Sequence, residues 1–453
     1  MSCELLTGAT GFLGSHLLRD ALIAGREVAV VVRPGRAASA RQRVDAVLDG
    51  FRGATPPALP LPMPTVIEGD LRRPDLGMDA ASRAWVAEHC DRVVHCAASL
   101  DFRFRAGEPY LSNVDGTRYV LQLCRDAGIR DFHMVSTAYV CGNRAGTVLE
   151  DELECGQAFS NDYERSKFLG ETLVRQAPFL DRWTVYRPSV IVGDSTTGFA
   201  ATKDGLYALL SLAGLAAGKS PEAILARLGF SATERVNLVP VEWVSAVITH
   251  LVERQGREST TYHLTNPEPP MARDLLRAAH HLIAQAPPAP SQALDGLLDV
   301  YGPYLKHHCT FDTTHTARDA AALVCPRIEG EVLHRLIGFF ATRGIAPAGA
   351  EQARPDMALV VAGGGTFDLS AAAAAARDMA PEYAAAARVQ AHCNASTLER
   401  LLGAELTVEQ AVYAGLVALE GEPSSMEHAT YLLESFLAAN RETPAAVSAG
   451  DAA

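Results

Sequence analysis

The residues that most constrain the fold are the glycines of TGATGFLG, near the N-terminus. Gly8, Gly11 and Gly14 stand three apart, between the apolar run ELL (4–6) and the helix-like run SHLLRDALIAG (15–25). A glycine-rich turn between a first strand and a helix lets the backbone approach a pyrophosphate, and the N–H groups at the helix start favour negative charge. Tight turns of structural origin also contain glycines. The place of this turn at the start of a βαβ unit nevertheless predicts a nucleotide-binding loop.

Short apolar runs alternate with helix-like segments over the first 195 residues. Strands are expected at 4–6, 27–33, 65–70, 92–98, 131–137 and 182–193, and further strands at 235–241 and 261–265. Continuous apolar strands separated by helices indicate a parallel sheet covered on both faces. We therefore predict an α/β fold with a Rossmann-type, doubly wound parallel sheet.

The length of 453 residues predicts more than one domain. A first domain is expected over 1–345, with a nucleotide-binding core over 1–195 and 235–265 and a smaller substrate-binding part in the remainder. A linker is expected over 346–356, an Ala-rich helical C-terminal region over 357–440 and a disordered tail over 441–453. The glycine-rich VVAGGGTFD (360–368) is expected to be a loop.

The composition excludes some classes of function. A net charge of -13 argues against nucleic acid as a partner, because the phosphate backbone needs a basic face. No apolar stretch is long enough for a membrane span and no signal sequence begins the chain, so a cytoplasmic location is expected. The cysteines form no CxxC pair, which suits a reducing compartment. Cys96, Cys124 and Cys141 lie in apolar runs and are expected in the core.

The stretch LKHHCTFDTTH (305–315) gathers metal-ligand residue types. Its spacing matches no zinc pattern, so no metal site is predicted, and a structural or substrate-lining role is expected instead.

The end of the second expected strand discriminates between the two nicotinamide dinucleotides. A carboxylate there accepts the ribose 2′-hydroxyl of NAD, whereas an arginine accommodates the 2′-phosphate of NADP. This chain has Arg33 at that end and no carboxylate nearby. Arg36, Arg41 and Arg43 follow, so a solvated basic loop is the alternative. The pattern favours NADPH.

A candidate catalytic pair lies in NDYERSKFLGE. Tyr163 and Lys167 are four apart, which places both on one face of a helix. A lysine ammonium near a tyrosine stabilises the phenolate, and the tyrosine can exchange a proton with an oxygen undergoing hydride transfer. Such pairs are frequent by chance. Thr137, at the end of an expected strand, lies where ligands bind in open α/β sheets and strengthens the hypothesis.

Together these stretches resemble the extended short-chain dehydrogenase/reductase superfamily from residue 3 to about 270. Its motifs occur in the superfamily's order and approximate spacing as TGATGFLG, GDL (69–71), HCAA (95–98), NVDGT (113–117), STAYVCG (136–142), Tyr163 with Lys167, and YRPSVIVG (186–193). Within the superfamily, HCAASLDF, STAYVCG and YRPSVIVGDSTTG make the chain most similar to the thioester reductase and fatty acyl-CoA reductase group.

The resemblance implies NADPH-dependent reduction of an acyl thioester to an aldehyde or alcohol, in lipid or secondary metabolism. Thr137, Tyr163 and Lys167 would be catalytic, and counting five residues back from Gly142 selects Thr137 over Ser136. The implied cofactor-binding residues are Gly8, Thr10, Gly11, Phe12, Leu13, Gly14, Arg33, Arg43, Asp70, Leu71, Ala97, Ala98, Asn113, Tyr163, Lys167, Pro188, Ser189 and Val190.

The resemblance also implies a thioester donor. The first strand begins near residue 3, so an acyl-CoA or a separate acyl carrier protein is expected to supply the substrate. Basic residues within 103–108, or Arg125 with Arg130, are candidates for meeting an acidic carrier. Two alternatives stay open. One is an NADP-dependent carbonyl or sugar-nucleotide reductase or epimerase. The other is a non-catalytic NADP-binding regulatory protein, which the complete set of Thr137, Tyr163 and Lys167 disfavours.

Overall fold

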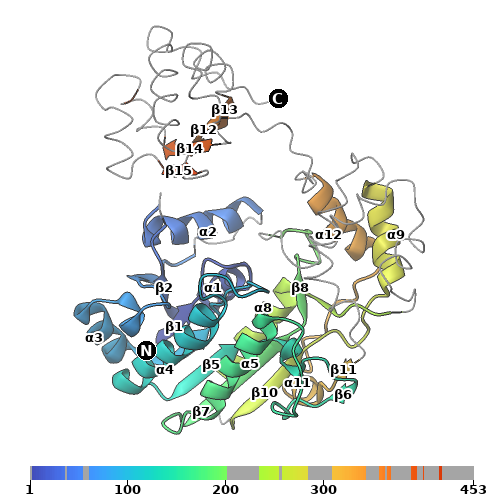
Figure 1. The fold of residues 1–453 in the computed structure, drawn as a ribbon, viewed down its shortest axis with the longest axis horizontal. Helices are drawn as coiled ribbons and strands as arrows, with labels where there is room; N and C mark the ends of the chain where they lie inside the picture. Colours follow the sequence, from blue (N-terminus) through green and yellow to red (C-terminus); the bar gives the residue numbers. More distant parts are fainter. Residues whose placement is uncertain are drawn as a thin grey trace. The chain divides into compact units, whose positions relative to one another are not determined.

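The computed structural model describes residues 3–35, 38–54, 61–200, 234–254, 258–283, 309–342, 357–362, 365–368, 389–394, 401 and 418–420 (Figure 1). The chain forms two compact units. The first comprises Met1–Pro34 with Ala40–Gly349, and the second comprises Gly35–Ser39 with Ala350–Ala453. The expected linker over 346–356 and the expected tail over 441–453 lie outside the described residues.

The first unit is built on a seven-stranded sheet in the order β10-β7-β5-β4-β1-β2-β3 (Figure 1). Every neighbouring pair in it is parallel, and Leu5 of the first strand in the chain lies level with Ala29 and Val93 of the strands on either side of it. This confirms the predicted doubly wound sheet. Its strands are β1 (Cys3–Thr7), β2 (Glu27–Val32), β3 (Thr65–Glu68), β4 (Cys90–His95), β5 (Asp131–Val135), β7 (Arg182–Pro188) and β10 (Thr260–Leu264).

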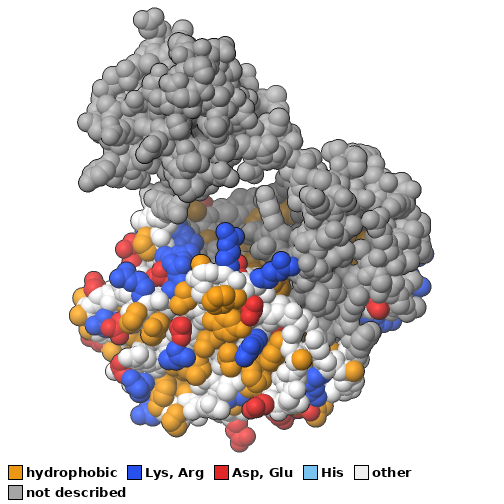
Figure 2. Space-filling model, in the orientation of Figure 1, with side chains coloured by type: hydrophobic (Ala, Val, Ile, Leu, Met, Phe, Trp, Pro, Cys, Tyr) orange, Lys and Arg blue, Asp and Glu red, His pale blue; other side chains and the backbone are white. Residues whose placement is uncertain are grey.

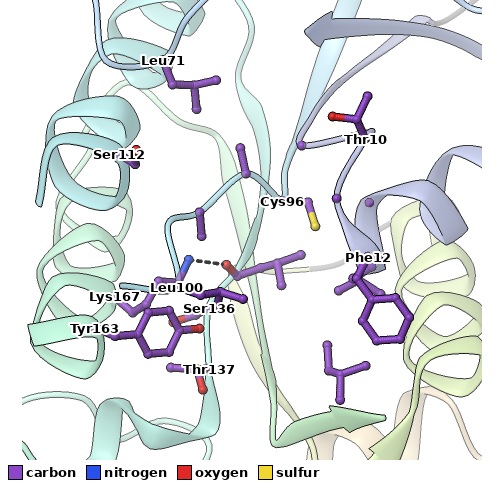
Figure 3. A pocket seen from close by; sticks show the side chains of 18 of the residues that line it. Thr10, Phe12, Leu71, Cys96, Leu100, Ser112, Ser136, Thr137, Tyr163 and Lys167 are labelled. Carbon is purple, nitrogen blue, oxygen red and sulfur yellow. Dashed lines mark hydrogen bonds between the residues drawn. The ribbon is translucent and has the colours of Figure 1, made fainter. Parts of the chain in front are cut away.

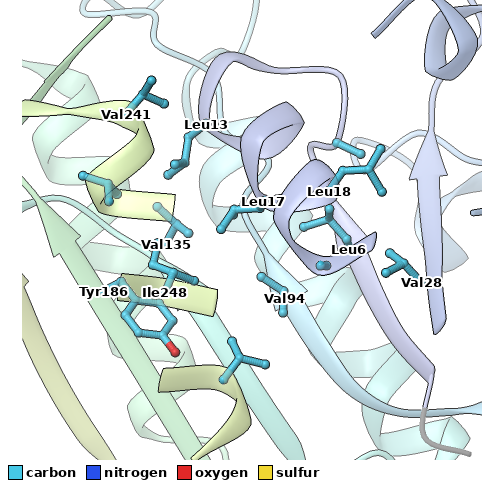
Figure 4. Close-up of a cluster of buried hydrophobic side chains, with 14 of the residues drawn as sticks. Leu6, Leu13, Leu17, Leu18, Val28, Val94, Val135, Tyr186, Val241 and Ile248 are labelled. Carbon is cyan, nitrogen blue, oxygen red and sulfur yellow. The ribbon is translucent and has the colours of Figure 1, made fainter. Parts of the chain in front are cut away.

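Helices cover both faces of this sheet because its strands are apolar on both sides. Leu6 and Val30 face α1 (Phe12–Ile23) and α8 (Val241–Glu253) in one core, which Figure 4 shows. Leu5 and Val31 belong to a second core, with α3 (Ala80–His89), α4 (Gly116–Ala127) and α5 (Asp162–Arg175). Each fully buried Leu or Val contributes roughly 1.5–3 kcal/mol relative to an exposed one. These two cores therefore hold the strand ends in place.

Short elements complete the first unit. Turns of 3-10 or π type lie at η1 (Pro74–Gly77), η2 (Leu111–Asp115) and η3 (Ala138–Cys141). Further helices among the described residues are α2 (Ala40–Ala54), α9 (Ala272–Ile283), α11 (Thr314–Asp319) and α12 (Gly330–Thr342). Two small parallel sheets pair β6 (Gly146–Val148) with β11 (Cys309–Phe311), and β8 (Val190–Val192) with β9 (Leu238–Pro240). A third core gathers residues of α9 and α12 around Val192 and Leu238.

One expected strand is divided in the structure. The run 182–193 forms β7 in the main sheet and then β8, which leaves that sheet and pairs with β9. Pro188 ends β7 and has no N–H to continue a ladder. Because the strand is divided here, residues 188–190 lie where the chain leaves the main sheet at the end of β7.

The second unit corrects the prediction of a helical region over 357–440. Its described residues include a four-stranded sheet in the order β13-β12-β14-β15, formed by β12 (Met357–Ala362), β13 (Gly365–Asp368), β14 (Val389–Asn394) and β15 (Ala418–Glu420). The expected loop at 360–368 instead belongs largely to the antiparallel pair β12–β13. Short apolar runs such as MALVVA fit strand pairing, whereas the prediction followed the alanine content around them. The Ala-rich segments at 370–380 and 429–440 lie outside the described residues.

The stretch 305–315 has a structural role where it is described. Cys309–Phe311 forms β11, and the His315 backbone N–H donates to the buried Glu150 carboxylate at 2.6 Å. His307 and His308 lie outside the described residues. In the part of the chain that the structure describes, no helix is long and apolar enough to cross a bilayer.

Candidate active site

A cavity of about 500 Å³ opens at the carboxyl ends of the parallel strands (Figure 3). Its walls include the glycine loop after β1, the end of β2, the segment after β4, the β5 end with Thr137, and Tyr163 and Lys167 of α5. Every residue that the sequence assigned to catalysis or cofactor binding lines it, with the exception of Asn113. Further lining residues, to which the sequence assigned no catalytic or cofactor-binding role, are Val31, Val32, Gly69, Arg72, Cys96, Leu100, Phe102, Ser112, Val135, Ser136, Tyr139, Ile191 and Val236.

The glycine loop is too tight for side chains. Gly8 has a φ of +79°, and a Cβ on it would lie 2.6 Å from the backbone N of Ala97. A Cβ on Gly14 would lie 2.0 Å from the carbonyl oxygen of Gly8. The N-cap of α1 is Gly11, and no side chain caps the helix there. The first N–H groups of α1 are therefore left for an anion, which fits a pyrophosphate.

One end of the cavity is cationic. Arg43, on α2, donates to the Arg33 carbonyl at 2.5 Å and to the Thr10 hydroxyl at 3.0 Å, which joins α2 to the glycine loop. Arg72 forms a two-point ion pair with Asp70 through bonds of 3.0 and 2.7 Å. Hydrogen bonds from Arg72 lower the pKa of Asp70, so this carboxylate is ionised and already paired. The guanidinium groups of Arg33 and Arg43 suit the 2′-phosphate of NADP.

Asn113 lies behind the cavity wall. It is 1% exposed, its amide oxygen accepts from the Ser99 N–H at 2.8 Å, and its amide nitrogen donates to the Ser99 carbonyl and the Ser166 hydroxyl, both at 2.9 Å. Its side chain thus ties the segment after β4 to α5. The structure places Asn113 as a support of the Ala97–Ser99 backbone and not as a residue facing a cofactor.

Helix α5 presents the candidate proton donor. The helix begins after Asn161, whose amide oxygen accepts from the Glu164 N–H at 2.9 Å, a side-chain N-cap. Tyr163 in the first turn is hydrogen-bonded to Thr137, but burial outweighs this bond and raises the pKa of the phenol. The Thr137 hydroxyl also lies 3.4 Å from the Pro188 carbonyl oxygen, an alternative acceptor for its proton. Tyr163 is therefore protonated at neutral pH and beside a second hydroxyl (Figure 3).

The structure also distinguishes Thr137 from its neighbour. The Ser136 hydroxyl donates to the buried carboxylate of Glu171 at 2.8 Å, so it is engaged away from Tyr163. This arrangement favours Thr137 as the oxyanion hydrogen-bond donor.

Lys167 is placed differently from the sequence expectation. Its ammonium donates to the Val135 carbonyl at 2.7 Å, and burial lowers its pKa to about 8, opposed by Cys96 and Glu171. The expected lowering of the Tyr163 pKa by this ammonium is not what the structure shows, because burial dominates at the phenol. Lys167 instead holds the end of β5 and lines the cavity.

Apolar side chains surround the reactive hydroxyls. The Phe102 ring lies 5.6 Å from the Tyr163 ring, centroid to centroid, and Leu100 lines the same wall (Figure 3). Cys96 packs against the core, as expected, and also borders the cavity, where burial raises the pKa of its thiol to about 12 and keeps it from acting as a thiolate. Beyond the rim Phe104 is 64% exposed beside the exposed Arg105. Figure 2 shows basic and apolar side chains interspersed on the described part of one face.

Comparisons with known proteins agree with this geometry. Residues 6–248 match the NAD-binding family model described as male sterility protein. The chain is 28% identical over 388 residues to the isonitrile lipopeptide synthase of Streptomyces coeruleorubidus, covering 78% of this chain and 25% of that protein. It is 27% identical over 289 residues to the carboxylic acid reductase of Mycobacterium marinum, covering 58% of this chain and 24% of that protein. The chain thus spans about a quarter of these two relatives.

A solved structure supports the fold. The terminal R domain from the myxalamid PKS-NRPS biosynthetic pathway superposes with a TM-score of 0.63 at 24% identity, covering 77% of this chain and 92% of that one.

Proposed function

This chain belongs to the male sterility protein family. We propose that it is a nicotinamide-dependent oxidoreductase of the extended short-chain dehydrogenase/reductase type. In this proposal it uses NADPH to reduce an acyl thioester to an aldehyde or alcohol. The observation that carries the proposal is one cavity with two chemically different ends. The glycine loop and the arginines form the nucleotide end, and Thr137, Tyr163 and Lys167 border the reactive end.

The nucleotide end fits NADPH better than NADH. Arg43 reaches from α2 to Thr10 of the glycine loop, and Arg33 lies beside it at the end of β2. Asp70, the carboxylate at this end, is already paired with Arg72. Two guanidinium groups would therefore meet a 2′-phosphate, whose charge they neutralise in a planar, multi-donor geometry.

The chain's residues supply the acid chemistry of the reaction. When bound, NADPH provides the hydride that adds to the thioester carbonyl carbon. Tyr163 and Thr137 donate hydrogen bonds to the oxygen as negative charge develops, and Tyr163 then gives up its proton to it. The product of this step is a hemithioacetal, which loses its thiol to leave an aldehyde. A second hydride and proton would give the alcohol.

The thioester donor follows from the relatives. A lipopeptide synthase and a carboxylic acid reductase are among them, so we propose an acyl group carried by a carrier protein or by coenzyme A, in lipid or secondary metabolism. The apolar wall of Leu100 and Phe102 would receive the acyl group next to the carbonyl. We propose a cytoplasmic location, where thiols stay reduced.

The test is NADPH oxidation against a panel of acyl-CoA and acyl-carrier thioesters, with products identified by mass spectrometry. Turnover to aldehyde or alcohol on at least one thioester is expected. Activity on a free ketone or a sugar nucleotide, without turnover of any thioester, would contradict the proposal.

A substitution at Arg33 tests the preference for NADPH over NADH. Arg33→Ala should raise the Kd for NADPH at least about tenfold and leave the Kd for NADH within about twofold, since only NADPH has the 2′-phosphate. Arg41→Ala is the matched control, because Arg41 is an exposed residue of α2 paired with Asp45 at 3.1 Å and does not line the cavity. Equal losses for the two cofactors would exclude a 2′-phosphate contact at Arg33.

A further inference from the structure

Helix α5 carries a third ionisable residue on the face of its catalytic pair. Tyr163, Lys167 and Glu171 are spaced four apart, so their side chains lie in one row on one face of the helix. Glu171 is fully buried and does not line the cavity. An ionised carboxylate is costly to bury unless several donors satisfy it. The hydrogen-bond partners of Glu171 must therefore stabilise its buried carboxylate.

The partners of Glu171 come from two strand ends and from α5 itself. The hydroxyl of Ser136, just after β5, donates to Oε2 at 2.8 Å. Arg187 of β7 donates through Nε to Oε2 at 3.1 Å and through its terminal nitrogen to Oε1 at 2.7 Å. Arg175, one turn along α5, donates to Oε1 at 3.0 Å. Glu171 thus joins the helix that carries Tyr163 to the strand that leads into Thr137.

Arg187 is itself held in one orientation. Its guanidinium donates to the Glu152 carbonyl at 2.7 Å and contacts His263 Nε2 at 3.2 Å. Burial lowers the pKa of His263 to about 3, so the ring is neutral. His263 Nδ1 then donates to the Asp312 carbonyl at 2.8 Å, which leaves Nε2 to accept from Arg187. The cation opposite Glu171 is therefore supported from β10 as well.

We propose that Glu171 is a positioning residue for the active site, holding Ser136 so that Thr137 stays beside Tyr163 and keeping Lys167 protonated by its negative charge. The first effect is geometric, because Ser136 is covalently next to Thr137 and its N–H is fixed by the Tyr186 carbonyl at 2.7 Å. Loss of the tether would let the oxyanion donor move, and displacements of about 1 Å cost up to roughly 100-fold in rate.

The second effect is electrostatic. The described groups that face Lys167 are Cys96 and the neutral His95 from β4 and the segment after it, the Val135 carbonyl from β5, and Tyr163 and Glu171 on α5 itself. Of these, Glu171 is the one in anionic form at neutral pH, since Arg187, Arg175 and Ser136 lower its pKa despite burial. It therefore opposes the burial that drives Lys167 to lose its proton.

The two effects are separated by two substitutions. Ser136→Ala removes the tether and keeps the charge, whereas Glu171→Gln removes the charge and keeps an acceptor for Ser136. On the proposed function, Ser136→Ala should lower kcat about tenfold with KM for NADPH within about twofold, because the nucleotide end is unchanged. The matched control is Ser245→Ala, which removes another buried hydroxyl-to-carboxylate bond, from Ser245 to Asp20 at 2.5 Å, away from the cavity.

The charge effect is measured without turnover. The chain's lysines are Lys167, Lys203, Lys219 and Lys306, so ¹³Cε-lysine NMR gives a short spectrum, in which Lys167→Arg identifies the Lys167 signal. Glu171→Gln should lower the titration midpoint of Lys167 by about one pH unit, and Ser136→Ala should leave it in place. If Glu171→Gln does not fold, Glu171→Asp is the second variant, because it retains the charge but withdraws it from Ser136. Glu171→Asp should keep the titration midpoint of Lys167 and should lower kcat as much as Ser136→Ala does.

These outcomes distinguish the inference from the proposed function. No turnover by the wild type on any thioester would contradict the function, while the lysine titration would still test the charge effect. The positioning role would be overturned if Ser136→Ala kept the wild-type kcat, or if Ser245→Ala lost as much kcat as Ser136→Ala. It would also be overturned if the titration midpoint of Lys167 stayed in place in Glu171→Gln or shifted in Glu171→Asp.

Discussion

At the scale of single residues, burial decides the protonation states at the reactive end. The Tyr163 phenol has a raised pKa and the Lys167 ammonium a lowered one, because each would be charged in a site with little water. A reductase needs a proton to give, so a protonated Tyr163 suits reduction. The Y-x-x-x-K spacing predicted which residues meet at the cavity. It did not predict that Lys167 would bond the Val135 carbonyl, since that depends on the end of a strand distant in sequence.

Removal of the phenol hydroxyl tests the proton donor. Tyr163→Phe should lower kcat about 100- to 10,000-fold, the usual range for a general acid, with the Kd for NADPH within about twofold. Steady-state kinetics and a fluorescence titration measure the two quantities. Tyr262→Phe is the control, because Tyr262 is another buried tyrosine, donating to Asp319 at 2.8 Å, and does not line the cavity. Activity that survives in Tyr163→Phe would assign the proton to another group.

The pKa of Lys167 predicts opposite pH dependences for stability and activity. Between about pH 8 and 10.5 the unfolded chain binds a proton that the folded lysine has released, so the contribution of Lys167 to stability rises with pH across this window. Activity that depends on the ammonium falls over the same window. The kcat/KM profile should therefore decline above about pH 8, and Lys167→Arg should shift the decline upward, because a guanidinium keeps its proton. A decline that stays near pH 8 in Lys167→Arg would assign it elsewhere.

At the scale of elements, the sequence predicted well those features that depend on neighbouring residues in the chain. The strand–turn–helix around the glycines and the ends of the parallel strands follow from short apolar runs and turn residues, and the structure confirms them. The role of Asn113 was not predictable in this way, because its amide bonds Ser99 and Ser166, which lie on two other segments. Arg72 was missed as well, since nothing in GDL indicates that the next residue pairs with Asp70.

The β1–α1 turn provides an element-scale prediction. Gly14→Ala places a Cβ 2.0 Å from the Gly8 carbonyl oxygen, a contact with backbone that the loop cannot relieve in place. The turn must open, so we expect a loss of roughly 1–3 kcal/mol of stability and at least about tenfold weaker NADPH binding. Thermal melting and a fluorescence titration check both. Gly50→Ala is the control: a Cβ there meets nothing within 4 Å, and both values should stay close to wild type.

At the scale of the whole molecule, the two units differ in how far sequence reasoning reaches. In the first, motifs and hydrophobic pattern agree with each other, and the parallel sheet follows. In the second, alanine-rich composition predicted helix where Met357–Ala362 and Val389–Asn394 form parallel strands. Alanine has high helix propensity, but pairing between segments some thirty residues apart overrides propensity and is not visible in a local window.

The division into units predicts that reduction needs only the first. All residues that line the cavity belong to Met1–Pro34 and Ala40–Gly349, and so do the three apolar cores around it. A chain ending at Gly349 should therefore fold, bind NADPH with a Kd within about twofold of the full chain, and keep kcat on a small acyl-pantetheine thioester. Melting curves, fluorescence titration and NADPH oxidation compare the two chains side by side. A folded truncated chain that binds NADPH normally but has lost kcat would instead assign part of the reactive end to residues 350–453.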